Sequence, residues 1–237
     1  MNVIITGASK GIGYQLAKLF SKNENNTVIG IARSEKLLKE LKNDCIRQNL
    51  RNKLKTIVFD IEDPNRVKKT LIKEIQQHTD SIDILINNAG FLVNKPFLAF
   101  EIDEIQKMFN VNVTSPAVLI QGLLPLLKKS KAAHVVNIAS MAGFQGSSKF
   151  PGLSFYSSSK AAFASLTECL AEEFKNDHIT FNALALGAVN TEMLNTAFPG
   201  FNAPLAANEM AEFIYDFAIN GCKYYNGKVL PVSLSTP

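Results

Sequence analysis

The chain of 237 residues is long enough for one large α/β domain or two small ones. Apolar residues make up 46% of it, and no apolar run reaches the roughly twenty residues of a membrane span, so the composition predicts a soluble globular protein. The net charge of +4 is scattered, and the basic run Arg47–Lys55 falls where a helix passes into a strand, which favours a solvated surface over a nucleic-acid site. The three cysteines are odd in number and widely spaced, which favours reduced thiols in a cytoplasmic protein without a metal site.

Short β-branched runs alternate with helical patterns along the whole chain, without a linker or a repeat. This alternation predicts a single α/β domain over residues 1–237, a Rossmann-type doubly wound parallel sheet of about seven strands with helices on both faces. Ligands of such sheets bind at the carboxyl ends of the strands. The predicted strands are Asn2–Thr6, Thr27–Ala32, Leu54–Asp60, Ile82–Gly90, His134–Ser140, Ile179–Gly187 and Lys228–Val232. The predicted helices are Gly13–Phe20, one from Ser34, one opened by Asp63-Pro64, Ile102–Lys129, Ser154–Phe174 and Asn208–Ile219.

The first predicted strand ends in TGASKGIG, from Thr6 to Gly13. Three glycines in a strand-to-helix turn let the backbone tighten, approach a pyrophosphate and pack the helix closely on the sheet. Because this turn opens the first βαβ unit of the chain, it predicts a dinucleotide site. The candidate cofactor-binding residues of the loop are Gly7, Ser9, Lys10, Gly11, Ile12 and Gly13.

The same loop, from Gly7 to Gly11, also fits the GxSxG pattern of a nucleophile elbow, with Ser9 as the nucleophile of a serine hydrolase. An elbow follows a strand deep in the sheet and needs an acid and a histidine downstream. Here the pattern follows the first strand, and His178 stands at the mouth of a strand rather than after one. A hydrolase is therefore kept as an alternative.

The end of the second predicted strand indicates which dinucleotide binds. A fold that prefers NAD carries an acidic residue about twenty positions beyond the glycine loop, where it holds the ribose 2′-OH. Ala32 occupies that place, Arg33 follows it, and Lys10 lies within the loop. Two cations without a carboxylate favour a 2′-phosphate, which predicts NADP(H), with NAD(H) as the alternative. Asp60 ends the third strand and either holds the adenine amino group or caps the next loop.

Tyr156 and Lys160 are spaced i, i+4 within the helical pattern that follows the fifth strand, so both point from one face. A free phenol is too weakly acidic to work as a base at neutral pH, and a nearby ammonium lowers its pKa. Tyr156 is therefore a candidate general acid/base for a carbonyl or an alcohol. Ser140 ends the preceding strand and is positioned to bind the same oxygen, or only to cap the strand.

The chain resembles a short-chain dehydrogenase/reductase over essentially its whole length. The motifs that carry the resemblance are TGASKGIG at Thr6, NNAG at Asn87, NVNVTSP at Asn110, NIASMAG at Asn137 and YSSSK at Tyr156, in the order that the family has. The resemblance implies that Tyr156 is the general acid/base and that Lys160 lowers its pKa and holds the nicotinamide ribose. It also implies that Ser140 orients the carbonyl and that Asn112 holds a water in a proton relay. Further residues that it assigns to the cofactor are Asn88, Ala89, Gly90, Gly187, Val189 and Thr191, whereas Asn87 is expected to brace the sheet.

Three departures from the family pattern are visible. Leu186 stands where the family usually has proline, which loosens one loop position at modest cost. Ser140 and Tyr156 are sixteen residues apart, a little more than usual, and the insert FQGSSKFPG predicts a surface loop near the substrate mouth. The chain ends in GKVLPVSLSTP instead of the common Asp-Gly-Gly, so subunit contacts there are expected to differ.

The segment after Thr191 takes the place of the family's variable substrate lid. It carries Met193, Leu194, Phe198 and Phe201 without a charge cluster, so these side chains either cover a small-molecule carbonyl or alcohol with an apolar body or pack on the protein. The two long predicted helices resemble the pair that builds the family's dimers and tetramers. The sequence thus predicts a cytoplasmic, homo-oligomeric NADP(H)-dependent oxidoreductase that binds neither nucleic acid nor membrane, and a non-catalytic dinucleotide sensor is the main alternative.

Overall fold

The computed structural model describes residues 1–48, 50 and 53–234, so Arg51 of the basic run and the last three residues of the chain lie outside the described part. Seven parallel strands form one sheet in the order β3-β2-β1-β4-β5-β6-β9. Their bounds are β1 Asn2–Thr6, β2 Thr27–Ala32, β3 Lys53–Val58, β4 Ile84–Asn87, β5 Ala133–Ser140, β6 Ile179–Leu186 and β9 Lys228–Val232. This arrangement confirms the predicted doubly wound parallel sheet.

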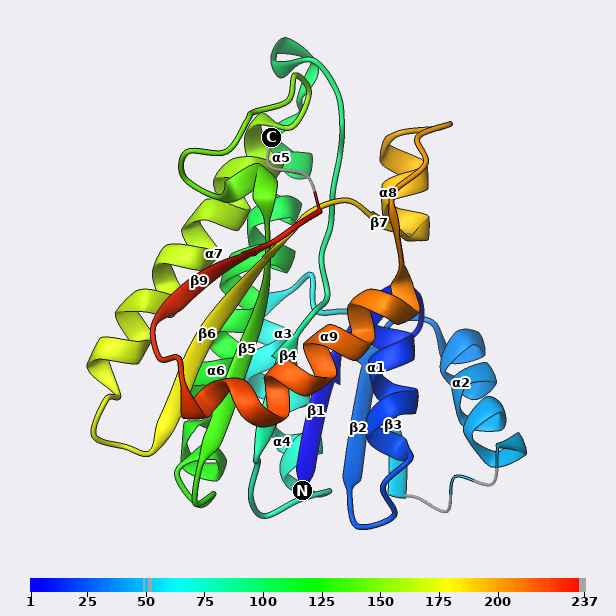
Figure 1. The fold of residues 1–237 in the computed structure, drawn as a ribbon, viewed down its shortest axis with the longest axis vertical. Coiled ribbons are helices and arrows are strands. Elements are labelled where there is room, and N and C mark those ends of the chain that lie inside the picture. Colours follow the sequence, from blue (N-terminus) through cyan, green and yellow to red (C-terminus); the bar gives the residue numbers. More distant parts are fainter. Residues whose placement is uncertain (49, 51–52, 235–237) are drawn as a thin grey trace.

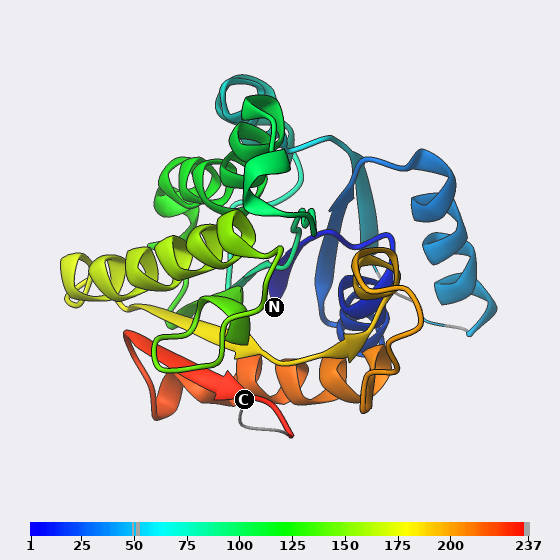
Figure 2. The ribbon, with the colours of Figure 1, turned by 90° about the horizontal axis from the view of Figure 1, so that it is seen from above.

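Helices cover both faces of the sheet. Figures 1 and 2 show α1, α2 and α9 on one face and α3, α4, α6 and α7 on the other. The helical elements are α1 Gly11–Ser21, α2 Glu35–Arg47, α3 Pro64–Arg66, η1 Val67–Leu71, α4 Ile72–Gln76, η2 Phe97–Ala99, α5 Ile102–Phe109, η3 Asn110–Thr114, α6 Ser115–Leu127, η4 Met141–Gly143, α7 Ser154–Glu173, α8 Glu192–Ala197, α9 Ala207–Asn220 and η5 Gly221–Lys223. A separate two-stranded pair joins β7 Val189–Asn190 to β8 Leu205–Ala206.

The central strands are mostly apolar because each face of the sheet meets its own core. Along β1, Val3 and Ile5 pack with α1 and α9, whereas Ile4 between them packs with η1 and α6 on the other face. This alternation follows from the two-residue period of a strand. A parallel sheet covered on both faces leaves its two edges, formed by the strand ends, as the places where ligands can reach it.

Several element boundaries follow from local chemistry. Ser34 accepts a hydrogen bond from the amide of Leu37 and begins α2, and Asp63 accepts from the amide of Asn65 and begins α3 with Pro64 in its first turn. The predicted strand Ile82–Gly90 is shorter in the structure, because Asn88 turns its amide to the hydroxyl of Thr6 instead of the ladder. The short helix α8 and the β7–β8 pair are features that the sequence patterns did not indicate.

The predicted helix Ile102–Lys129 is continuous, but it contains a π-helical turn, η3, between α5 and α6. Among the described residues, Ile102–Leu127 is the one helical stretch long and apolar enough to cross a membrane by those two measures. Half of its most apolar window is buried inside the protein, and Leu119, Leu123 and Leu127 belong to the core beside the sheet. A core helix of a soluble protein meets the same test, so the stretch is weak evidence of a membrane span.

Candidate active site

The glycine loop after β1 lies tightly against the start of the loop after β4. Gly7 and Gly11 have φ of +72° and +52°, which disfavours residues with a side chain. A Cβ at Gly13 would lie 2.3 Å from the carbonyl oxygen of Gly7 and 2.5 Å from Nδ2 of Asn88, so no side chain fits there. Asn88 Nδ2 donates to the carbonyl oxygen of Thr6 at 2.9 Å and holds the two loops together. The first turn of α1 therefore presents its backbone at the carboxyl edge of the sheet, as phosphate binding requires.

The second strand ends directly beside this loop. The amide of Gly7 donates to the carbonyl oxygen of Ile31 at 2.8 Å, which brings the end of β2 against the glycine turn. Ala32 is buried and Arg33 and Lys10 are exposed, so both predicted cations flank the loop without an acid at position 32. Asp60 lies at the end of β3, half-buried, and its Oδ1 accepts from the amide of Glu62 at 3.1 Å. The capping role predicted as an alternative for Asp60 is thus present in the structure.

Tyr156 and Lys160 project from α7 into the protein, and their side chains are buried. Lys160 Nζ lies 5.9 Å from the centre of the Tyr156 ring and donates to the carbonyl oxygen of Ile138 in β5 at 2.7 Å. Burial lowers the pKa of Lys160 to about 8, because the charged form loses its hydration. Burial also raises the pKa of the Tyr156 phenol, and a hydrogen bond with Ser140 lowers it by less.

In this structure the pKa of Tyr156 is set by burial and by Ser140, so the predicted lowering of that pKa by Lys160 stays a prediction. Desolvation dominates the pKa of the phenol, and the ammonium group is directed to the Ile138 carbonyl oxygen instead of the phenol oxygen. The phenol is therefore held in its protonated form at neutral pH. A buried, protonated tyrosine is suited to donate a proton to an oxygen on which negative charge develops.

Ser140 stands at the end of β5 and faces the tyrosine. Its Oγ accepts a hydrogen bond from the amide of Ala142 at 3.2 Å, and this bond forms the cap of the η4 turn. The predicted capping role is thus present beside the hydrogen bond to Tyr156. Because the oxygen already accepts from an amide, the hydroxyl proton remains for a donor role toward a substrate oxygen.

Asn112 lies in the π-helical turn η3 and is 1% exposed. Its Nδ2 donates to the carbonyl oxygen of Phe91 and to Oγ of Ser159, and its Oδ1 accepts from the amide of Phe91. The side chain therefore ties the loop after β4 to the α7 helix that carries Tyr156. Single π-helical turns of this kind occur often at functional sites.

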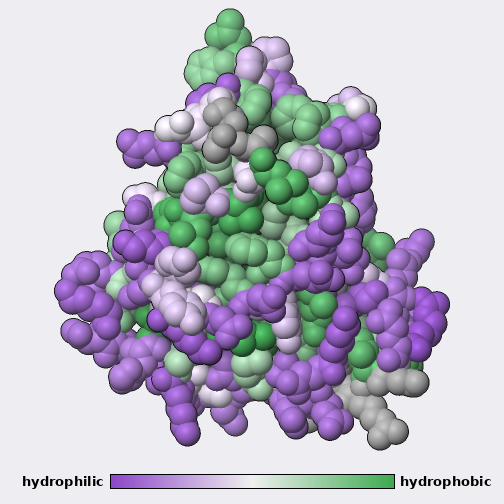
Figure 3. Space-filling view, viewed as in Figure 1, coloured by the Kyte–Doolittle hydropathy of each residue, from purple (hydrophilic) through white to green (hydrophobic). Residues whose placement is uncertain are grey.

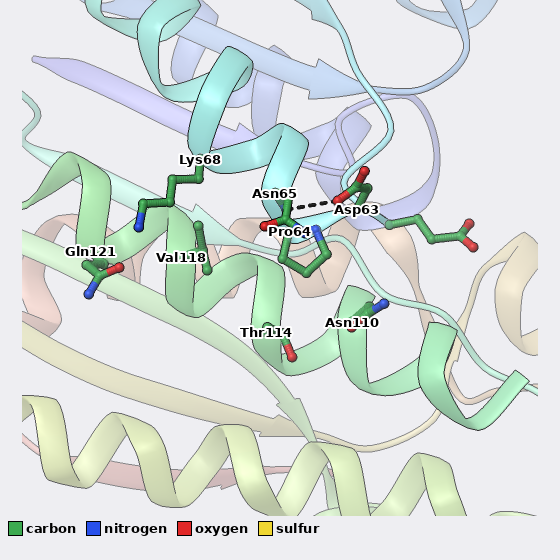
Figure 4. A pocket seen from close by; sticks show the side chains of 9 residues that line it. Asp63, Pro64, Asn65, Lys68, Asn110, Thr114, Val118 and Gln121 are labelled. Carbon is green, nitrogen blue, oxygen red and sulfur yellow. Dashed lines mark hydrogen bonds between the residues drawn. The ribbon is translucent and has the colours of Figure 1, made fainter. Parts of the chain in front are cut away.

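Asn110, two residues earlier, is directed elsewhere. Figure 4 shows it in an outer pocket, together with Thr114 of the same turn and with Asp63, Asn65 and Lys68 of the segment after β3. The π-helical turn thus separates the two asparagines of the NVNV motif, and Asn112 is the one that lies in the site.

Asn87 braces the sheet, as predicted. Its Nδ2 donates to Oδ1 of Asn137 on β5 at 2.8 Å, and Asn137 Nδ2 donates to the hydroxyl of Thr167 on α7 at 2.9 Å. This buried chain of hydrogen bonds connects β4, β5 and α7. It fixes the helix that carries Tyr156 relative to the strand that carries Ser140.

The remaining predicted cofactor residues surround the same space. A Cβ added to Gly90 would meet Asn112, Met193 and Lys160 at 3.6 to 3.7 Å, so this glycine lies between the predicted lid and Lys160. The amide of Ala89 donates to the hydroxyl of Thr6.

Leu186 is buried at the end of β6 and continues the strand, so the missing proline leaves the strand intact. Gly187, Val189 and Thr191 follow it, and Thr191 lies 3.2 Å from where a Cβ of Gly11 would be.

Sequence reasoning missed four residues that build the site. Thr6 accepts from the amides of both Asn88 and Ala89, and Ser159 holds Asn112. A Cβ at Gly143 would lie 2.6 Å from the amide of Ala161, so this glycine lets η4 pack against α7. Asn94 connects the loop after β4 to the lid. Only Thr6, Gly143 and Ser159 fall within motifs that the sequence singled out.

The three histidines lie at the opposite edge of the sheet from Ser9. Ser9 follows β1 at the carboxyl edge, whereas His178 precedes β6, and its carbonyl accepts from the first residue of β5. His134 is the second residue of β5 and is buried against α9, and His78 follows α4 before β4. In a parallel sheet these positions are at the amino edge. The structure therefore contradicts the alternative of a serine hydrolase built on Ser9.

Apolar side chains line the space around Tyr156. Met108, Ala142 and Leu153 form a buried cluster with the tyrosine. Aromatic and aliphatic residues from three segments pack against it, namely Phe91, Leu92, Val93, Phe100, Phe155 and Phe198. Met193 and Phe201 of the predicted lid are 41% and 50% exposed, so they are not core residues of this chain.

Comparison with known proteins agrees with this geometry. A family model described as short chain dehydrogenase matches residues 1–200. An uncharacterized oxidoreductase of Staphylococcus saprophyticus is 34% identical over 194 residues, which cover 81% of this chain and 75% of that protein. The ketoacyl reductase HetN of Nostoc sp. is 32% identical over 188 residues, which cover 79% of this chain but only 63% of HetN, less than two thirds of its length.

A solved structure of a short chain dehydrogenase from Escherichia coli CFT073 in complex with NADPH superposes with a TM-score of 0.87. It is 25% identical, and the match covers 97% of this chain and 95% of that one. The chain therefore belongs to the short-chain dehydrogenase family and is an oxidoreductase of that family.

Proposed function

We propose that this chain transfers a hydride between NADP(H) and a ketone or aldehyde and its alcohol, with Tyr156 as the general acid/base. The observation that carries the proposal is the group of half-buried Ser140 and buried Tyr156 and Lys160 beside the glycine loop at the carboxyl edge of the sheet. A non-catalytic dinucleotide sensor would use Lys160 to hold the ribose, but it would have no use for the Ser140 hydroxyl paired with the phenol of Tyr156 beside that lysine.

The residues present fit a dinucleotide. The left-handed Gly7 and Gly11 and the crowded Gly13 leave backbone where side chains would block a pyrophosphate, and Gly90 keeps the space next to Lys160 open. Arg33 and Lys10 supply positive charge where a 2′-phosphate would lie, which supports NADP(H) over NAD(H). When bound, the nicotinamide supplies or accepts the hydride. Gly187, Val189 and Thr191 would hold its carboxamide side, and Lys160 its ribose.

The protein's own residues manage the proton and the substrate oxygen. The hydroxyl of Ser140 donates a hydrogen bond to the carbonyl oxygen and holds that oxygen next to Tyr156. Tyr156, protonated because of its raised pKa, gives its proton to that oxygen as negative charge develops. The Lys160 ammonium stabilises the phenolate that remains.

Asn112 supports the reprotonation of the Tyr156 phenolate. Its side chain is held by Phe91 and Ser159, which fixes the residue beside α7, where a relay water could return a proton to Tyr156. The apolar cluster around Tyr156 excludes bulk water and suits a substrate whose carbonyl carries an aliphatic or aromatic body.

The decisive experiment measures NADPH oxidation with a panel of aliphatic and aromatic ketones and aldehydes. We expect turnover by the wild type and a loss of at least about 100-fold in kcat for Tyr156→Phe, because the proton donor is removed while the ring remains. Unchanged turnover by Tyr156→Phe with every accepted carbonyl would refute the mechanism. NADPH binding without turnover of any carbonyl or alcohol would favour the sensor.

We also propose that the protein is a cytoplasmic homodimer or homotetramer. The exposed side of α7 carries small uncharged residues along its middle, Ala161, Ala162, Ser165 and Cys169, with the acidic residues Glu168 and Glu172 toward its end. Figure 3 shows apolar surface gathered over the region of β9, where Leu234 is 72% exposed. Faces that lack charged side chains at their centre are typical of subunit interfaces. Light scattering should give a dimer or a tetramer for the wild type and a smaller species for Ala162→Arg, and a wild-type monomer at micromolar concentration would refute this.

A further inference from the structure

Three segments meet above Tyr156 at the carboxyl edge of the sheet. They are the entrance loop (residues 91–101, after β4), the insert (residues 144–153, before α7) and the lid (residues 192–204, which contain α8). Figure 1 shows the entrance loop and α8 rising beyond the strand ends. Each segment contributes apolar side chains to the cluster around Tyr156, such as Phe91, Leu153 and Phe198.

The entrance loop is fixed to the body of the protein. The rings of Phe97 and Phe100 pack on Phe155 of α7 with centres 5.5 and 4.9 Å apart. Lys95 pairs with Glu104 of α5, and its ammonium lies 5.5 Å from the centre of the Phe100 ring. These contacts hold the backbone around position 94 in place from two helices.

The lid is held much less firmly. Its helix α8 has six residues, none of them buried, and the β7–β8 pair at its base joins only two residues of each strand. Of the hydrogen bonds between described residues, the one that joins α8 to any segment outside residues 187–206 runs from Nδ2 of Asn94 to the carbonyl oxygen of Ala197, at 3.0 Å. Phe198, which reaches the Tyr156 cluster, is the next residue after this acceptor.

Asn94 is itself placed by the insert. The amide of Lys95 donates to the carbonyl oxygen of Gly152 at 3.2 Å. Gly152 has φ +85°, and a Cβ at this position would lie 2.0 Å from Oδ1 of Asn94. The glycine therefore leaves the space in which the Asn94 side chain is oriented toward the lid.

We propose that Asn94 is a positioning residue that latches the lid over Tyr156 and so retains a carbonyl substrate with an apolar body. The role in substrate binding rests on the proposed function. Asn94 is exposed and contacts no reacting atom, so it acts through the lid alone. Loss of the latch should raise KM for the carbonyl, leave the affinity for NADPH unchanged, and leave kcat unchanged or raised, because an open lid releases product sooner.

The first test needs no substrate. Hydrogen–deuterium exchange of the lid amides is compared in the wild type, Asn94→Ala, and Asn176→Ala, a matched change at an exposed asparagine beyond the end of α7. We expect about fivefold faster exchange in residues 192–201 for Asn94→Ala, which corresponds to one lost hydrogen bond, and no change for Asn176→Ala. Equal lid exchange in Asn94→Ala and the wild type would overturn the latch, whatever the enzyme's substrate is.

The second test is a double-mutant cycle between Asn94 and Gly152. In the wild-type background, Gly152→Ala pushes Asn94 aside and should raise KM for the carbonyl by about the same fivefold as Asn94→Ala. In the Asn94→Ala background, the added methyl group has no latch to disturb, so it should raise KM little further. Additive effects of Asn94→Ala and Gly152→Ala on KM would overturn the proposal. If no carbonyl is turned over but the lid amides of Asn94→Ala still exchange faster than those of the wild type, only the proposed function is refuted.

Discussion

Lys160 has the least favourable environment of any residue in the site. The residue is 4% exposed and its ammonium donates to one main-chain carbonyl oxygen, so the charge is held mainly at the expense of folding stability. The pKa lowered to about 8 expresses that cost. Residues kept for chemistry commonly carry such a cost, because activity and stability select different environments.

Replacing Lys160 by methionine should therefore separate its effect on activity from its effect on stability. We expect Lys160→Met to lose at least about 100-fold in kcat while its free energy of unfolding at pH 7 stays equal to the wild type or rises by about 1 to 2 kcal/mol. Urea denaturation followed by circular dichroism measures the second quantity. A strongly destabilised Lys160→Met would show that the lysine is a structural residue.

The same pKa predicts a pH dependence. Below pH 8 Lys160 carries its charge, and above it the ammonium loses its proton, so kcat/KM for NADPH should be level at neutral pH and fall above about pH 8. Initial rates between pH 6 and 10 measure this profile. Activity that keeps rising to pH 10 would contradict a requirement for the charged lysine.

Arg33 bears on the choice of cofactor. Arg33→Ala should weaken NADPH binding by about tenfold to 100-fold, because a charge-assisted bond to the 2′-phosphate is lost, and leave NADH binding unchanged. Fluorescence titration with both cofactors measures the effect, with Lys42→Ala on the exposed side of α2 as the control. Equal losses for both cofactors would mean that Arg33 only supports the fold.

At the scale of elements, the site depends on how closely η4 packs on α7. Gly143→Ala would bring a methyl group within 2.6 Å of the Ala161 amide and 2.7 Å of the Lys160 carbonyl carbon, and both are backbone atoms that cannot step aside. We expect a loss of about 2 to 4 kcal/mol in the free energy of unfolding, together with reduced kcat because Ser140 and Tyr156 move apart.

Gly146→Ala provides the comparison for this change. Gly146 has φ +82° but nothing within 4 Å of an added Cβ, so it should cost only about 1 kcal/mol of backbone strain. Thermal unfolding measures the loss of stability in Gly143→Ala and Gly146→Ala, and steady-state rates measure the loss of kcat. Similar, small losses in both would show that η4 and α7 can separate without harm.

Much of this element structure could be predicted from the sequence. The strand and helix order, the glycine turn and the Tyr156–Lys160 pair follow from local patterns whose physics is local as well. The pKa of Tyr156 could not be predicted, because it depends on how completely the neighbouring segments bury the ring. Asn94 could not be predicted either, since its partner Ala197 is 103 residues away and neither residue belongs to a motif.

At the scale of the whole molecule, the carboxyl and amino edges of the sheet carry different kinds of polar groups. The carboxyl edge carries the candidate chemistry, and the amino edge carries a buried polar network around His134. Nδ1 of His134 lies 3.0 Å from the carbonyl oxygen of Ala218, and Nε2 lies 3.0 Å from Nδ2 of Asn182, which also donates to the carbonyl oxygen of Tyr225. This network joins β5, β6 and α9 with a neutral imidazole.

The network should make folding sensitive to acid. Burial lowers the pKa of His134 to about 4, whereas the unfolded chain binds the same proton near 6.5. The free energy of unfolding should therefore decrease as the pH falls from about 6.5 to about 4, by about 3 kcal/mol in total from this residue. Urea denaturation at several pH values measures the decrease, and His134→Gln should show a shallower one; identical slopes would contradict the assignment.

The π-helical turn at Asn110–Thr114 has a consequence for how this chain tolerates change in length. Such a turn holds one residue more than regular α-helix would, and a single residue corresponds to a rotation of about 100°. Because the wide turn accommodates that extra residue, deleting one residue here would restore regular helix and leave α6 in nearly the same rotation relative to α5. The deletion would instead remove the bulge that places Asn112 beside Phe91 and Ser159, so the site would change although the helix remains.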